Sequence, residues 1–313
     1  MMSFLISFFA SICLSERSSH PVEFELTGLI VIPGLGRADR LTNVVSNIKK
    51  IEQFLDSTLI NHWDCVVYIY ALRLEKSFWK MEPELNYLKR FCSIIENPGG
   101  KVTENMFWVQ PALIRNKYKY VFLLLDDCKL ESMNSNGRFP LDFLLLAMTR
   151  NNLTVVSPMI TGANKVGGNK FRNIMQAPAM DNSDGYISSY LEIFAWIMTF
   201  PAYEALWQLL YPSVNPYGWG HDFWYNGYAK ERVKGHKMGI VSRIVVKHEQ
   251  NVLLEGQGRT DNTRIEDKWN AVLAQERHYK QYLHIDLAYY RKTLDIANSS
   301  WNGAVKGLLP KLL

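Results

Sequence analysis

Two adjacent carboxylates, Asp126 and Asp127, directly follow one of the most apolar runs of the sequence, residues 120–125. Their mutual repulsion costs free energy when both are ionised, unless solvent, a partner or a cation offsets it. Carboxylate oxygens suit Mg²⁺ or Mn²⁺, whose coordination shell typically includes nucleotide phosphates. The pair therefore predicts a divalent-cation site. The alternative is a solvated acidic turn in which an Asp caps a helix.

A glycine-containing turn with two arginines follows an earlier apolar run. Gly34 and Gly36 allow a ligand to approach the backbone closely, and Arg37 and Arg40 are suited to phosphate groups. The turn is not a complete dinucleotide-binding motif, because Asp39 stands at the third glycine position, and this argues against a dehydrogenase. We interpret the turn as a nucleotide contact; the alternative is a tight strand-to-helix turn capped by Asp39.

The third candidate is the segment Gly218-Trp219-Gly220-His221-Asp222. Glycines on both sides of the Trp permit a flexible loop that carries a flat apolar ring. An Asp beside a His on such a loop is suited to acid–base chemistry or to binding a substrate hydroxyl. The alternatives are an aromatic-rich turn in the core and, for the Asp, a helix-capping role.

The fourth candidate, His248, ends an apolar alternating run. A ligand for a metal or phosphate and a structural histidine are both consistent with its residue type.

The elements that must position these residues follow a strand–helix alternation. Apolar runs predict strands over residues 27–33, 65–71, 93–95 and 120–125, and helical spacing predicts helices over residues 41–54, 74–88 and 103–116. Such alternation predicts an α/β fold with a mainly parallel sheet and helices on both faces. Ligands of these folds bind beyond the carboxyl ends of the strands, where the acidic pair and the glycine turn both lie.

The composition is that of a globular protein. The chain has 313 residues, 48% of them hydrophobic, with 35 Lys plus Arg and 30 Asp plus Glu. This excludes a disordered chain, and the absence of a basic cluster indicates no nucleic-acid partner. Cys13, Cys65, Cys92 and Cys128 form no CxxC pair, which excludes zinc ribbons and iron–sulfur motifs and leads us to expect free, buried thiols.

We expect three parts in the chain. Residues 1–20 form an apolar leader, residues 24–257 a catalytic domain, and residues 258–313 a mostly helical extension packed on it. The apolar stretch 2–14 is short for a bilayer span and lacks a basic start. As a signal peptide or anchor it would associate with the membrane and place the protein in the Golgi or ER lumen; otherwise the protein is cytoplasmic.

Together these motifs resemble the GT-A fold of nucleotide-sugar glycosyltransferases, and more narrowly the family called domain of unknown function 707. The resemblance covers residues 27–257. It is strongest over residues 185–207, over Gly218 to Phe223, and over Val245-Val246-Lys247-His248. The sequence departs from the Asp-x-Asp pattern of GT-A enzymes, because here the acidic motif reads Asp126-Asp127-Cys128.

The resemblance implies a role for each matching position. Asp126 and Asp127 would hold Mn²⁺ or Mg²⁺ on the donor diphosphate, with His248 completing the metal shell. Asp222 would be the general base. Glu192 and the Trp219-Gly220-His221 segment would bind the substrate.

The implied function is a metal-dependent transfer of a sugar from a nucleoside-diphosphate donor to a hydroxyl acceptor, such as a glycan or glycoprotein. The alternatives are a nucleotidyltransferase using the same acidic pair, and a catalytically silent carbohydrate-binding protein of the same fold.

Overall fold

The computed structural model describes residues 27–55, 63–70, 81–97, 100–131, 139–161, 185–248 and 265–291. These residues contribute nine strands to a single sheet. The strands are β1 (Gly28–Leu35), β2 (Trp63–Ile69), β3 (Cys92–Glu96), β4 (Tyr120–Leu124), β5 (Cys128–Leu130), β6 (Val155–Thr161), β7 (Gly185–Ser188), β8 (Ala195–Thr199) and β9 (Met238–His248).

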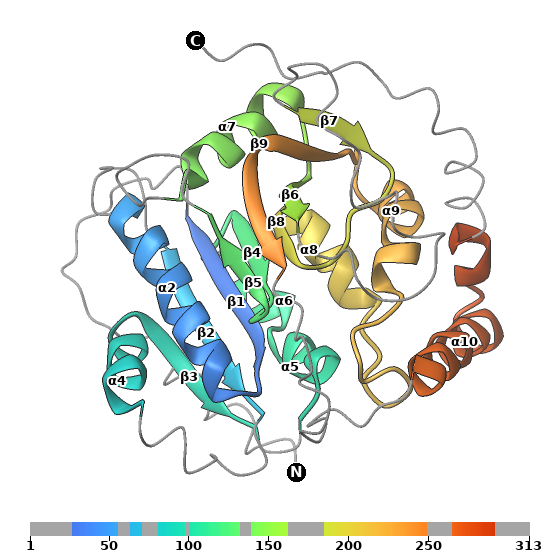
Figure 1. Ribbon diagram of the computed structural model, residues 1–313. Coiled ribbons are helices and arrows are strands. Elements are labelled where there is room, and N and C mark those ends of the chain that lie inside the picture. The colour runs from blue at the N-terminus through green and yellow to red at the C-terminus, as the bar shows by residue number, and fades with distance from the viewer. Residues whose placement is uncertain are drawn as a thin grey trace.

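The strand order is β3-β2-β1-β4-β8-β6-β9-β5, with β7 also paired to β9 (Figure 1). The block from β3 to β4 is parallel throughout, and β6 pairs with β9 in parallel. Antiparallel pairs join β4 to β8, β8 to β6, and both β5 and β7 to β9. Strand β9 is thus the element that connects β5, β6 and β7.

Central strands send alternate side chains into two apolar cores, one on each face of the sheet. In β4, Phe122 and Leu124 enter one core, while Val121 and Leu123 enter the other. Helices α2 (Ala38–Leu55), α4 (Glu82–Phe91) and α7 (Leu141–Asn151) cover the first face. Helices α5 (Val102–Trp108), α6 (Pro111–Ile114), α8 (Phe200–Gln208), α9 (His221–Arg232) and α10 (Ile265–Tyr282) contribute to the second core.

The predicted α/β class with helices on both faces is confirmed, and the four predicted strands are present within a few residues of their expected bounds. One predicted helix is wrong: residues 103–116 form two short helices, α5 and α6. Pro111 occupies the first turn of α6, where its missing N–H costs nothing, whereas inside a longer helix it would break the hydrogen-bond ladder. Residues 74–80 of the predicted 74–88 helix lie outside the described residues, and helix α4 begins at Glu82.

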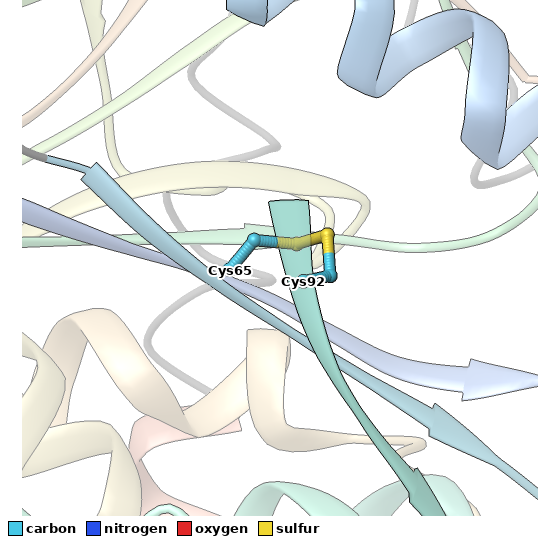
Figure 2. The surroundings of a disulfide bond; sticks show 2 residues. All are labelled: Cys65 and Cys92. Carbon is cyan, nitrogen blue, oxygen red and sulfur yellow. A yellow bond between two sulfur atoms is a disulfide. The ribbon is translucent and has the colours of Figure 1, made fainter. Parts of the chain in front are cut away.

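The cysteines differ from the sequence-based expectation. Cys65 of β2 and Cys92 of β3 lie opposite each other in the parallel ladder and form a disulfide (Figure 2). Their Cα atoms are 4.4 Å apart. Cys128 is a buried free thiol, as expected. The expectation failed for Cys65 and Cys92 because partners on adjacent strands are set by register, which cysteine spacing does not show.

The expected leader, residues 1–20, lies outside the described residues. Among the helices described, none has both the length and the apolar character needed to cross a bilayer. Of the expected C-terminal extension, the described part is largely helix α10, whose Val272 and Tyr279 are buried in the second core.

Candidate active site

The acidic pair occupies the turn between β4 and β5, and Arg40 from the first turn of α2 contacts both carboxylates. Its Nη1 atom lies 3.3 Å from Asp126 Oδ1 and 3.4 Å from Asp127 Oδ2. The backbone N–H of Gly36 donates to the carboxylate of Asp126. The turns after β1 and β4 therefore meet at one edge of the sheet, as the parallel pairing of these strands requires.

The three charged groups respond differently to burial. Burial and the neighbouring Asp127 raise the pKa of Asp126. Burial also disfavours ionisation of Asp127, but hydrogen bonds and charge from His248 and Arg40 outweigh it, and the pKa of Asp127 is lowered. The pKa of Arg40 is raised, because the two carboxylates more than offset the effect of its burial. Arg40 thus supplies the positive charge that this pair needs.

Two asparagines of α2 hold the turn that carries the pair. Asn43 Nδ2 donates to the carbonyl oxygens of Asp126 at 2.9 Å and of Cys128 at 2.8 Å. Asn47 Nδ2 donates to the Cys128 carbonyl at 2.6 Å, and its Oδ1 accepts from the Leu130 N–H at 2.9 Å. The helix thereby fixes the backbone of the β4–β5 turn, and with it the direction of both carboxylates.

His248, which lies much later in the sequence, also contacts the acidic pair. It ends β9 and pairs with Cys128 of β5, so that its Nε2 lies 3.1 Å from Asp127 Oδ2. The ring of Phe194 stacks on the imidazole with a centroid distance of 4.3 Å. The sequence-based grouping of the acidic pair with His248 is therefore present in the structure, 121 residues apart in the chain.

A divalent cation fits this site only in part. Asp127 and His248 offer one oxygen and one nitrogen ligand of types that Mn²⁺ accepts. Asp126 instead faces Arg40 and the Gly36 N–H. In the described part of the chain, no group of three or more His, Cys, Asp or Glu side chains could hold a metal ion. Two protein ligands would therefore leave most of the shell to water or to a bound diphosphate.

The glycine turn differs in detail from the expectation. Gly34 belongs to β1, and only Gly36 and Arg37 lie in the turn. A Cβ atom on Gly34 would come within 2.7 Å of the Tyr70 ring, and one on Gly36 within 2.5 Å. Both glycines are therefore explained by the packing of Tyr70. Arg37 pairs with Asp39 at 2.8 Å at the surface, so Arg40 alone of the two arginines reaches the acidic pair.

Asp222 lies at the second position of α9, and both of its carboxylate oxygens accept hydrogen bonds. The Tyr190 hydroxyl donates to Oδ2 at 2.9 Å, and the Phe223 N–H donates to Oδ1 at 3.1 Å. Burial raises the pKa of Asp222 to about 6, and these hydrogen bonds limit the rise. A carboxylate with this basicity is suited to accept a proton near neutral pH. The helix-capping alternative is supported only by the Phe223 contact, because the N-cap residue is Gly220.

Glu192 interacts electrostatically with Asp222 and with Cys128, the residue that follows the acidic pair. Burial, and next the charge of Asp222, raise the pKa of Glu192 well above its ordinary value and so favour the protonated form, which can donate a hydrogen bond. It lines a small pocket that also includes Ser157, Tyr186 and Tyr190. Two residues further on, Phe194 contacts His248. Segment 190–194 thus connects the basic carboxylate to the acidic pair.

The Gly-Trp-Gly turn presents an aromatic surface beside Asp222. Trp219 is 38% exposed, and its carbonyl accepts a hydrogen bond from Asn215 at 2.7 Å. Its ring meets the edge of Trp269 from α10, and Trp269 stacks on Phe223 with an angle of 5° between the planes. The turn itself depends on Gly220, whose φ of 88° lies in the left-handed region.

His221 does not fit the substrate-binding role that we expected. Its side chain is fully buried, with its ring against Trp224. Burial lowers the pKa of His221 to about 4, so it is neutral. The side chain supports the start of α9 from inside the core.

Three site residues were absent from the sequence-based set: Tyr190, Phe194 and Trp269. Tyr190 and Phe194 lie in the irregular segment between β7 and β8, where no periodicity marks a role. Trp269 lies on a helix about 50 residues after the turn it packs against. For Tyr190 the sequence did offer a signal, because it carries a hydroxyl group two positions before the acidic Glu192.

No family model matches the chain, and no match was found among curated proteins. Solved structures do match. One is GalNAc-T7 with UDP, GalNAc and Mn²⁺, with a TM-score of 0.52 and 14% identity over 88% of this chain and 56% of that one. Another is TarS of S. aureus, with a TM-score of 0.51 and 10% identity over 89% and 45%. The fold is of the GT-A glycosyltransferase type. The chain spans only about half the length of these two structures.

Proposed function

We propose that this protein transfers a sugar from a nucleoside-diphosphate donor to a hydroxyl group of an acceptor such as a glycan. The observation that carries the proposal is segment 190–194, which joins two chemically distinct ends of one site. At one end Asp127, His248 and Arg40 converge, and at the other lies Asp222, whose pKa is raised by burial. The GT-A type of fold is consistent with this arrangement. The motif resemblance to domain of unknown function 707 leads us to propose membership of that family too.

The residues divide the work by charge. Arg40 and the Gly36 N–H supply positive charge and a donor beside the acidic pair, where a diphosphate would bind. Asp127 and His248 would hold Mn²⁺ or Mg²⁺, and the Mn²⁺ in the GalNAc-T7 structure supports this part of the proposal. Such an ion would offset the charge of the departing diphosphate. Asp222 would take the proton of the acceptor hydroxyl, and Glu192, whose protonated form burial favours, would form a hydrogen bond with a sugar hydroxyl.

The decisive experiment incubates the protein with a panel of sugar nucleotides and mixed glycan acceptors, with Mn²⁺ or with EDTA. Glycosyl transfer releases a nucleoside diphosphate, whereas nucleotidyl transfer from the same sugar nucleotide releases a sugar 1-phosphate, and a silent carbohydrate-binding protein releases neither. We expect nucleoside diphosphate and a glycosylated product, in amounts that fall with EDTA.

Asp222→Asn tests the base within the same assay. We expect donor binding to survive while transfer falls about 10²- to 10⁴-fold, which is typical of the loss of a general base. Transfer at the wild-type rate by Asp222→Asn would rule out this residue as the base and direct attention to Glu192 or to a retaining mechanism.

A further inference from the structure

Tyr190 is the one side chain whose hydroxyl contacts the Asp222 carboxylate among the described residues. The hydroxyl donates to Oδ2 at 2.9 Å, while the Phe223 N–H donates to Oδ1 at 3.1 Å. Two donors on two oxygens fix the rotation of the carboxylate about its Cβ–Cγ bond. The remaining lone pairs are then the ones available to an acceptor hydroxyl.

Tyr190 is itself held firmly. Only 4% of it is exposed, and its ring stacks on Phe223 with a centroid distance of 6.0 Å. The Ser188 hydroxyl donates to the Tyr190 carbonyl, and the Tyr190 N–H donates back to Ser188 Oγ at 3.2 Å. The tyrosine therefore enters the site from a braced turn after β7, and the position of its hydroxyl is set by that turn.

Resting on the proposed function, we propose that Tyr190 is a positioning residue for Asp222: its buried hydroxyl orients the carboxylate toward the acceptor and moderates its basicity. A merely structural tyrosine would contribute the stacked ring but would not act on the carboxylate. The titratable groups that interact with Asp222 are Tyr190, which donates a hydrogen bond to it, and Glu192, whose pKa the charge of Asp222 raises. The neighbouring His221 is neutral.

The sign of the effect follows from the hydrogen bond. A donor to the ionised carboxylate favours ionisation, so removing it raises the pKa of Asp222 further above its wild-type value of about 6. A general base must be ionised to work, and the rate therefore falls at the acid end of the pH profile. Without the Tyr190 hydroxyl, that fall begins at a higher pH.

Tyr190→Phe tests this, because phenylalanine keeps the ring stacked on Phe223 and removes only the hydroxyl. The matched control is Tyr225→Phe on α9, which loses a hydrogen bond of the same length, from the buried Tyr225 hydroxyl to the Ala202 carbonyl at 2.9 Å. We expect the acid limb of kcat/KM to move up by about one pH unit in Tyr190→Phe, and to stay in place in Tyr225→Phe. Donor KM stays near the wild-type value in both.

A second readout needs no activity. The ¹³C carboxyl signal of Asp222, assigned by its loss in Asp222→Asn, is titrated in the wild type, Tyr190→Phe and Tyr225→Phe. We expect a higher midpoint in Tyr190→Phe alone. Absence of transfer by the wild type would overturn the proposed function and leave this titration decisive for Tyr190. An unchanged midpoint, or an acid limb that coincides in the two Phe variants, would overturn the positioning role.

Discussion

Asp222 shows how a single side chain can cost stability at neutral pH. Burial removes more hydration from the carboxylate than the hydrogen bonds from Tyr190 and Phe223 replace, and this raises the pKa of Asp222 to about 6. The folded state then binds a proton more tightly than the unfolded chain. Stability contributed by the protonated form is present below the unfolded pKa and is lost as the pH rises through about 6.

We therefore predict that Asp222→Asn is more stable than the wild type at pH 8, by about 1–3 kcal/mol, because the amide carries no charge to desolvate. The gain should shrink toward pH 5, where the wild-type carboxyl is protonated. Urea unfolding at the two pH values measures it. If Asp222 only capped helix α9, Asp222→Asn would be less stable than the wild type at both pH values, and that result would contradict the prediction.

Arg40 is the corresponding residue at the other end of the site. It contacts Asp126 and Asp127 together, so its single positive charge already offsets part of the charge of the pair before any ligand arrives. A cation entering beside Asp127 must share that carboxylate with a guanidinium. This explains why adjacent carboxylates in a sequence indicate a charged site without determining which cation they hold.

At the scale of elements, the start of α9 depends on close contact with α10. A Cβ atom on Gly220 would lie 2.8 Å from Val272 Cγ2, in addition to the strain of a φ of 88°. Gly235 offers the matched case: its φ is 69°, and nothing lies within 4 Å of the position of its Cβ. The two positions separate backbone strain from packing between helices.

We predict that Gly235→Ala lowers the free energy of unfolding by about 1–2 kcal/mol, the cost of the left-handed conformation alone. Gly220→Ala should lose about 1–3 kcal/mol more, because α10 must move away. It should also reduce transfer, since Trp219 and Phe223 flank the turn. Chemical denaturation of both variants measures the difference. Equal losses of unfolding free energy would show that α10 can move away from residue 220 at no cost in stability, and would contradict the prediction.

The sequence predicted the strands and helices better than the contacts between them. Apolar runs located four strands, and the strand-end rule brought Arg40 to the acidic pair, because both depend on local pattern and on parallel topology. The disulfide partner of Cys65, and Tyr190 beside Asp222, depend on register and on an irregular turn. Neither leaves a periodic trace in the sequence. Gly34 was assigned to a ligand, although the packing of Tyr70 accounts for it.

At the scale of the molecule, the Cys65–Cys92 disulfide joins β2 to β3, the strand at one end of the sheet order. It closes a loop with a sequence separation of 27 residues. Restricting the unfolded chain in this way contributes about 3.5 kcal/mol in the loop-entropy model. Disulfides persist in oxidising compartments, and a lumenal or extracellular location would preserve this one.

We predict that the double variant Cys65→Ala/Cys92→Ala loses about 2–5 kcal/mol of unfolding free energy. The wild type treated with dithiothreitol should fall to the same value, whereas the reductant should leave the double variant unchanged. Denaturation with and without reductant measures this. A wild type that is insensitive to reductant, with both thiols alkylated in the native protein, would contradict the prediction.

The position of strand β9 late in the chain also determines when the sheet can be completed during synthesis on the ribosome. The parallel block from β3 to β4 is complete once residue 124 has emerged, and it can form its own ladders. Strands β5 and β7 can pair with β9 only when residues 238–248 have been synthesised, and His248 is the last residue of that strand. More than a hundred residues are therefore synthesised between strand β5 and its partner β9. During this time the nascent chain exposes an unpaired strand edge that is prone to aggregation, and chaperones would protect it.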